Sequence, residues 1–379
     1  MDLIIDGNAF INVAISVTKS STMRDRRTEE KYYVNDLFND NSFLLKDHIR
    51  ISFRNFCFTY LNSLIAPIGS SINSVHFVFD SKSWRKEYTN SFFENSDFNT
   101  TSAPTEFKYK DNRKYDEYQY LFFDYFQNVI IPALNETCGV NHYRFKGTEG
   151  DDIIAYLCHT LNENILIYTV DQDIKQTIAT PNKNVMVIVP KQMSKTKKLF
   201  VPANFIPEQA EDEFDEFFSL NDSHISGSTI DKIIKSLKNK DYAEYVVDPV
   251  DEILTKILLG DKSDNIPKIT GITPSKAKKI ITNLTSQFEN NLLSKLDSLD
   301  PEFILAFLEE IKTINKVKDS DKTEEIRANL LFNIKIIRLA ISLFPDEIRE
   351  PLESFFETYQ VTKINSREFT NLKNNQSSL

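Results

Sequence analysis

The fold of this chain is decided by Gly147-Thr148-Glu149-Gly150-Asp151-Asp152 and the residues that follow as far as Thr177. After Asp152, apolar residues recur at helical spacing, so one face of a helix is expected to be buried. The run Ile165–Tyr168 comes next and is long enough for a strand but too short for a helix. Asp171-Gln172-Asp173 follows it. This order predicts an α/β fold with a central, mostly parallel sheet flanked by helices.

Two pairs of carboxylates in this stretch are expected to meet. Glu149 and Asp151 begin the expected helix, and Asp171 and Asp173 follow the strand. Both pairs therefore lie at the carboxyl edge of the sheet, where open α/β folds place their ligands. Such concentrated negative charge repels itself unless protons or cations neutralise it, and oxygen ligands without His or Cys suit magnesium or manganese. For either motif alone, a structural role at a helix start or in a turn is the commoner explanation.

Further carboxylates arrive from elsewhere in the chain. The strand expected at Leu3–Ile5 is followed by Asp6, and the strand expected at Val75–Asp80 ends in an aspartate. Gly260-Asp261-Lys262-Ser263-Asp264 comes after a helix expected at Ile253–Leu259. Asp6, taken alone, is better explained as an aspartate that opens a turn. Together these aspartates strengthen the case for a metal site.

Length and composition limit the class of protein. With 379 residues the chain is expected to hold two domains, or one with large elaborations. It has no apolar run of membrane-spanning length and no signal-peptide pattern, and scattered Cys57, Cys138 and Cys158 indicate buried thiols in a reducing cytoplasm. The five histidines lack ligand spacing, so zinc is not expected. A net charge of −10 argues against a protein that simply coats nucleic acid, although discrete basic segments permit phosphate contacts.

The remaining segments have less decisive patterns. Helices are expected at about 45–64 and 116–137, strands at 143–145 and 185–189, and amphipathic helices over 302–359. Residues 20–31 read as an exposed basic loop, and the Ser/Asn/Thr-rich stretch 89–105 as a mobile loop. In Phe107–Lys114 bases and aromatics alternate, which fits either a surface that threads a single strand or a solvated helix start.

A helix, a short turn and a lysine-bearing helix that starts at Pro274 resemble a helix-hairpin-helix, in which backbone amides and a helix N-terminus hold a phosphate. In their order along the chain, the motifs resemble the structure-specific 5′-nucleases, which include flap endonucleases and the 5′-3′ exonuclease domain of bacterial DNA polymerase I. The resemblance is closest to the ribonuclease H of T-even bacteriophages. It includes the arch-like Tyr109–Arg113 and the helical segment Asn329–Tyr359. No single motif is specific, but six in register are.

The resemblance implies a PIN-like 5′-nuclease core with a helical arch, a helix-hairpin-helix and a helical C-terminal domain. The core would span 1–250, with the arch at about 82–116 and an insertion at about 190–248. The helical domain would span 251–365, with the hairpin at about 253–282, and 366–379 would be a polar tail.

The resemblance also implies roles for individual residues, and two Mg²⁺ ions for which Mn²⁺ substitutes. The expected first metal site consists of Asp6, Asp80, Glu149 and Asp151, with Asp152 as a supporting acid. The expected second site consists of Asp171, Asp173, Asp261 and Asp264, with Asp151 between the two. Lys110 and Arg113 would approach the scissile phosphate. The residues expected to bind nucleic acid are Arg85, Lys86, Lys108, Lys110, Arg113, Lys262, Lys268, Lys276, Lys278 and Lys279.

The implied function is a magnesium-dependent 5′-3′ exonuclease and flap endonuclease with ribonuclease H activity, which removes RNA primers and adjacent DNA during replication. Its substrates would be RNA–DNA hybrid and nicked or flapped duplex DNA, and it would act as a monomer in the cytoplasm. A single-strand-binding protein or a sliding clamp is a partner by resemblance alone.

Two alternatives compete with this function. A PIN-type ribonuclease shares the acidic core but is smaller and lacks the arch and the Asp261/Asp264 hairpin. A non-catalytic replication factor could keep the fold, yet all nine expected positions carry carboxylates.

The chain departs from the family pattern in three ways. Gly150 replaces the usual alanine, which is expected to loosen the first helical turn. Thr273 replaces a glycine of the hairpin, which puts phosphate or monovalent-ion binding there in doubt. The inserts at 89–106 and 190–248 are expected to alter substrate choice.

Overall fold

The computed structural model of the protein describes residues 1–20, 22–24, 31–33, 47–65, 72–95, 109–110, 119–162, 164–180, 185–190, 197–202, 246–365 and 367–368. Lys108, Arg113, most of the expected arch and most of the 190–248 insertion lie outside these residues.

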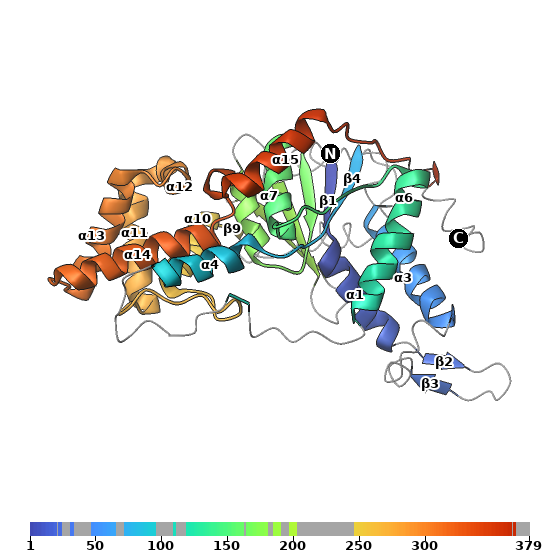
Figure 1. Ribbon diagram of the computed structural model, residues 1–379, viewed down its shortest axis with the longest axis horizontal. Coiled ribbons are helices and arrows are strands. Elements are labelled where there is room, and N and C mark those ends of the chain that lie inside the picture. The colour runs from blue at the N-terminus through green and yellow to red at the C-terminus, as the bar shows by residue number, and fades with distance from the viewer. Residues whose placement is uncertain are drawn as a thin grey trace.

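A mostly parallel sheet forms the centre of the molecule (Figure 1). Its strand order is β5-β4-β1-β6-β7-β8-β9, and the first five strands run parallel, whereas β8 is antiparallel to β7. The expected α/β fold class is confirmed by this topology. The strands are β1 (Asp2–Asp6), β4 (Ser74–Val78), β5 (Asn141–Tyr143), β6 (Ile165–Tyr168), β7 (Val185–Pro190), β8 (Lys197–Pro202) and β9 (Val246–Val247).

Helices cover both faces of the sheet. Side chains alternate between the two faces of a strand, so Leu3 and Ile5 pack into one apolar cluster and Ile4 into the other. The first face is covered by α1 (Gly7–Ser20), α3 (Asp47–Ile65) and the continuous run α5 (Gln119–Tyr125), π-helical η3 (Phe126–Ile130) and α6 (Ile131–Cys138). The second face is covered by α7 (Gly150–Thr160), the 3₁₀ turn η4 (Asp173–Ala179) and α15 (Asp346–Thr358).

A third apolar cluster lies beside the sheet, at the left in Figure 1, and packs the helices α10 to α14 together. There α10 packs on α11 and α14, and the loop Gly260–Thr273 joins α10 to α11. Asp248 and Thr273 cap the N-termini of these two helices. The helix–loop–helix arrangement matches the expected hairpin, while the domain boundaries remain predictions. The helices are α10 (Pro249–Leu259), α11 (Pro274–Phe288), α12 (Leu292–Asp297), α13 (Pro301–Asn315) and α14 (Ser320–Ile337), with 3₁₀ turns η6 (Glu289–Asn291) and η7 (Ile341–Leu343).

Two expectations for loops were wrong. The stretch predicted to be mobile from residue 89 begins inside helix α4 (Trp84–Asn95). Tyr88 and Phe92, four residues apart, bring their rings to 6.1 Å and 4.8 Å from the ring of Phe332, so packing against α14 overrides a loop-like composition. The basic loop expected at 20–31 contains β2 (Thr22–Arg24) and the start of β3 (Lys31–Tyr33), which pair antiparallel.

The segment after α15 runs past β1 and β4 toward α6 (Figure 1) and reaches the edge strand β5 at Thr362. Ile364 donates its backbone N–H to the carbonyl of Asn73 at 2.9 Å, and Asn365 donates to the carbonyl of Cys138 at 2.9 Å. Fully buried Asn141 of β5 accepts hydrogen bonds from the Tyr359 hydroxyl at 2.9 Å and the Thr362 amide at 3.0 Å. This segment therefore fastens the helical part of the chain to the edge strand.

All three cysteines are buried free thiols, as the sequence predicted. Within the described residues, no helix is both long and apolar enough to cross a membrane.

Candidate active site

Parallel pairing brings the expected carboxylates to one edge of the sheet. β1 pairs with β4 on one side and with β6 on the other, so the carboxyl ends of the three strands are adjacent. Asp6 ends β1, Asp80 comes two residues after β4, and Asp171 comes three residues after β6. Helix α7 starts at the same edge, because the Gly150 amide donates to Oδ1 of Asp80 at 2.6 Å. We use the name acidic basin for these three carboxylates together with those of Glu149, Asp151, Asp173, Asp261 and Asp264.

Neutral donors orient the carboxylates at the centre of the basin. Asp6 accepts from the Ala9 amide at 2.9 Å and from the Thr169 hydroxyl at 2.8 Å. Asp80 accepts from the Asn8 side chain and from the Gly150 amide, each at 2.6 Å. These donors fix the positions of the oxygens and carry no net charge, so they do not cancel the charge of the carboxylates.

The pKa values at the centre reflect this charge. Burial, followed by the nearby charge of Asp80, raises the pKa of Asp6 to about 7. Burial and Asp171 raise the pKa of Asp151 well above its ordinary value. The same two causes raise the pKa of Asp173 to about 6. Asp6 and Asp151 at the centre, and Asp173 beside them, therefore keep their protons to a higher pH than ordinary carboxyl groups unless a cation replaces the protons.

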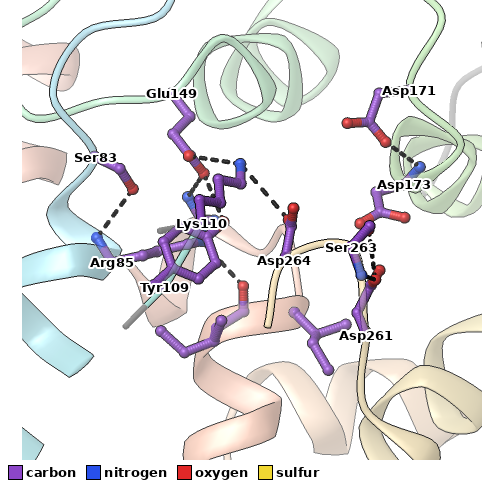
Figure 2. Close-up of polar contacts among 12 residues, drawn as sticks. Ser83, Arg85, Tyr109, Lys110, Glu149, Asp171, Asp173, Asp261, Ser263 and Asp264 are labelled. Carbon is purple, nitrogen blue, oxygen red and sulfur yellow. Dashed lines mark hydrogen bonds and ion pairs between the residues drawn. The ribbon is translucent and has the colours of Figure 1, made fainter. Parts of the chain in front are cut away.

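On one flank of the basin, the protein supplies the neutralising charge itself (Figure 2). The Arg85 guanidinium lies 3.0 Å from Oε2 of Glu149 and 2.7 Å from Oδ1 of Asp152. Lys110 Nζ lies 2.7 Å from Oε1 of Glu149, and the Tyr109 hydroxyl donates to Oε2 of Glu149 at 3.1 Å. Burial opposes the effect, but Lys110 and Arg85 still lower the pKa of Glu149 to about 2.

Two expected roles change on this flank. Arg85 was predicted to bind nucleic acid, which is wrong, because it is only 1% exposed and its Nε donates to the carbonyl of Ile336 at 3.0 Å. Asp152 has both oxygens occupied by Arg85, and Trp84 donates a further hydrogen bond to Oδ2 at 3.1 Å. Its carboxylate supports Arg85 and does not open into the basin.

Lys110 lies between two carboxylates of the basin. Figure 2 shows its ammonium between Glu149 and Asp264, and the distance to Oδ2 of Asp264 is 3.6 Å. Its backbone amide donates to the carbonyl of Asp264 at 3.2 Å. The backbone of Lys110 adopts the left-handed conformation, with a φ of 56°. The expected arch segment is thus anchored in the basin at Lys110. The ammonium of this lysine bridges the carboxylates of Glu149 and Asp264.

The opposite flank contains a lysine that the sequence did not single out. Lys256 of α10 binds the carboxylate of Asp173 and lies 2.7 Å from Oδ2 of Asp261. The Ser263 amide and hydroxyl bind Oδ1 of Asp261 at 2.8 Å and 2.5 Å (Figure 2). Against the effect of burial, Lys256 and Ser263 lower the pKa of Asp261 to about 2. Thr169 and Asn8, which orient the central aspartates, were also missed.

The donor chemistry of the basin fits a hard divalent cation. All its candidate ligands are carboxylate oxygens, and the central ones repel one another. As placed among the described residues, no three His, Cys, Asp or Glu side chains form a closed metal-binding set. Lys110 and Lys256 instead stand between carboxylates on the two flanks.

The hairpin presents most of the lysines that were expected to bind nucleic acid. Lys262, Lys268, Lys278 and Lys279 are exposed, and Lys86 is half-buried. Lys276 differs, because its ammonium donates to the carbonyl of Gly271 and to the side chain of Asn315, both at 2.9 Å. Thr273, the expected departure from the family pattern, caps α11 by accepting from the Lys276 amide at 3.4 Å.

Comparison with known proteins gives one curated relative and several solved structures. No family model matches the chain. A 5′-3′ exonuclease from Aquifex aeolicus (strain VF5) is 26% identical over 195 residues, which are 50% of this chain and 52% of that protein. The chain thus spans about half the length of this curated relative.

Two solved structures come from bacteriophage T5. The zinc-bound 5′-exonuclease has a TM-score of 0.47 at 14% identity, over 98% of this chain and 100% of that one. The D15 flap endonuclease, in a pseudo-enzyme-product complex with DNA and metal ions, has a TM-score of 0.46 at 14% identity, over 98% of this chain and 99% of that one.

None of the relatives named above is a ribonuclease H of T-even phages, and that closer resemblance remains a prediction. The chain is similar in sequence to a 5′-3′ exonuclease. This similarity confirms the resemblance to the 5′-nucleases that its motifs predicted.

Proposed function

We propose that this chain is a metal-dependent 5′-3′ exonuclease and flap endonuclease of the 5′-nuclease family. One observation carries the proposal: carboxylates from separate parts of the sequence gather at one sheet edge, where burial and the charge of Asp80 raise the pKa of Asp6 to about 7. Gathering like charges in a partly buried site is costly unless a ligand of opposite charge is bound. The similarity to a 5′-3′ exonuclease supports the same conclusion.

The central ion would be held by Asp6, Asp80, Asp151 and Asp171, and the second by Asp173 and Asp261, with Glu149 and Asp264 at the rim. When bound, such ions supply an activated hydroxide and stabilise the leaving oxygen of a phosphodiester. The natural ion is proposed to be Mg²⁺, with Mn²⁺ able to replace it, because the ligands are all oxygens.

The chain's own residues orient the substrate and stabilise its charge. Lys110 already holds its ammonium among the basin carboxylates, from which it can donate to a phosphate oxygen as negative charge develops there. Arg113 is proposed to act beside it. The lysines of the α10–α11 loop and the start of α11 would hold the duplex through its backbone, so little sequence preference is expected.

The proposed substrates are nucleic acids with a free 5′ end: RNA–DNA hybrid, nicked duplex and flapped duplex. Ribonuclease H activity and removal of RNA primers with adjacent DNA during replication belong to this proposal. We propose that the protein acts as a monomer in the cytoplasm, with a single-strand-binding protein or sliding clamp as partner.

The test is an assay with 5′-labelled hybrid, flap and nicked substrates in Mg²⁺ and in EDTA. We expect short 5′ products only with the metal. Asp171→Asn should abolish cleavage while circular dichroism and substrate binding stay as in the wild type. Asp321→Asn, which changes an exposed aspartate in the first turn of α14, is the matched control and should cleave normally.

Two outcomes would overturn the proposal. Cleavage by Asp171→Asn at the wild-type rate would remove the basin from catalysis. Tight, metal-independent binding without any cleavage by the wild type would favour a non-catalytic replication factor.

A further inference from the structure

Lys256 is held in place by the structure around it. Its helix, α10, buries Ile253, Leu254, Ile257 and Leu258 in the helical core, so the backbone at Lys256 is fixed. A second salt bridge, 2.7 Å between Lys175 Nζ and Oε1 of Glu252, also joins η4 to α10. The side chain of Lys256 is 31% exposed, and those of Asp173 and Asp261 are 22% and 13% exposed. The ammonium is thus presented to two partly buried carboxylates by packed elements.

The two halves of the basin differ in this respect. At the centre, Asp6 accepts from the Ala9 amide and the Thr169 hydroxyl, which are neutral. Between Asp173 and Asp261, the positive charge is already present and covalently attached to the chain. A divalent ion that enters between these two aspartates must displace the ammonium or share the carboxylates with it. Like charges a few ångströms apart in a partly buried site repel strongly.

We propose that Lys256 is the resident counter-cation of the Asp173–Asp261 pair, so that the protein binds one divalent ion tightly at the centre of the basin and a second, weaker ion only as Lys256 is displaced. This inference rests on the proposed function, since it concerns the ions of that same site. Lys256 is a positioning residue in this scheme. It keeps the Asp173–Asp261 pair together in the absence of metal and sets the metal concentration at which the second ion enters.

The test measures metal binding without nucleic acid, on the full chain, by calorimetric titration with Mn²⁺ and by the electron paramagnetic resonance of free Mn²⁺. For the wild type we expect two binding events that differ in affinity by at least roughly tenfold. In Lys256→Met the weaker event should tighten by roughly tenfold or more while the tighter event is unchanged. Lys262→Met is the matched control, because it removes the same charge from the exposed neighbour of Asp261 and should leave both events as in the wild type.

A second measurement needs no variant and covers the case in which Lys256→Met does not fold. Amine acetylation of the wild type, followed by mass spectrometry, reports how accessible each lysine is. Lys256 should react faster as Mn²⁺ is raised through the range of the second binding event, whereas Lys262 should react at a constant rate.

The outcomes separate this inference from the proposed function. If the wild type binds no divalent ion, both are overturned. If it binds two ions but Lys256→Met leaves the weaker event unchanged or weakens it, or the reactivity of Lys256 does not respond to Mn²⁺, then only the role of Lys256 is overturned.

Discussion

The Arg85 flank and the centre of the basin use the same residue types at the same sheet edge, yet they are completed differently. Around Arg85, Glu149 and Asp152 receive a buried guanidinium, and the pKa of Glu149 falls to about 2. At the centre, Asp6 meets neutral donors, and its pKa rises to about 7. The flank is therefore a structural ion cluster, while Asp6 at the centre either keeps a proton or binds a cation from solution. Proximity of carboxylates alone does not distinguish these two uses.

The largest expected effect comes from breaking the paired flank. Arg85→Met would leave Glu149 and Asp152 buried without their shared partner, which should lower the free energy of unfolding by about 3–5 kcal/mol. Denaturant unfolding followed by circular dichroism measures the change. Lys82→Met, which breaks the exposed pair with Glu87, should cause no measurable change. A loss for Arg85→Met as small as that of the control would mean that the cluster does not stabilise the fold.

The centre should respond to pH in the opposite direction from the flank. Folded Asp6 keeps its proton up to about pH 7, whereas the unfolded residue loses it near the ordinary pKa of about 4. The folded state binds more protons between these values, so this residue makes the free energy of unfolding fall as pH rises, by on the order of 4 kcal/mol for a pKa raised by about three units. Glu149 and Asp261, with pKa values lowered to about 2, instead lose their stabilising effect below about pH 4.

Unfolding of the wild type and Asp6→Asn in EDTA from pH 4 to 8 measures the effect. The difference between them isolates Asp6, because the other groups, including His76 with a pKa that burial lowers to about 3, are present in both proteins. Added Mg²⁺ should restore wild-type stability at pH 8. A difference that does not change with pH would show that the charge of Asp6 is already balanced.

A smaller change sharpens the comparison within the flank. Tyr109→Phe removes one donor to Glu149 and keeps Arg85 and Lys110, so it should cost about 1 kcal/mol. Unfolding in denaturant is again the measurement. The control is Tyr120→Phe, which alters a hydroxyl on a side chain that is 64% exposed. Equal stabilities for the two variants would show that the Tyr109 hydroxyl adds nothing to the cluster.

The smallest effect on stability is expected at Gly150. The sequence predicted only a looser helical turn, but a Cβ at this position would lie 3.1 Å from Oδ1 of Asp80. In Gly150→Ala, better helix propensity and crowding of Asp80 should nearly cancel, leaving stability within about 0.5 kcal/mol. Mn²⁺ affinity, measured by titration, should nevertheless fall because Asp80 is displaced. A clearly more stable variant with unchanged affinity would support the looser turn alone.

Local patterns predicted the frame of the site well. The α7 helix and strand β6 follow from hydrophobic spacing, and parallel pairing then requires Asp6, Asp80 and Asp171 to share an edge. Helix capping added Glu149 at the start of α7. These inferences need only the order of elements along the chain.

Pairing across the fold was not visible in the sequence. Arg85 lies in a basic run beside Lys86, and its carboxylate partners are 64 and 67 residues away, so a surface role was the natural but wrong interpretation. Lys256 resembles any polar residue on an amphipathic helix until α10 is placed against η4. Composition likewise failed for α4, because Tyr88 and Phe92 need Phe332 to form their packing face.

The hydrogen bonds at Asn141 have a consequence for synthesis of the protein. The edge strand β5 receives them from residues 218 and 221 positions later in the chain. On the ribosome, the sheet can assemble long before those residues emerge, and the buried side-chain oxygen of Asn141 then lacks these two donors. We therefore expect nascent chains that stop short of this segment to hold β5 less firmly than the folded protein does.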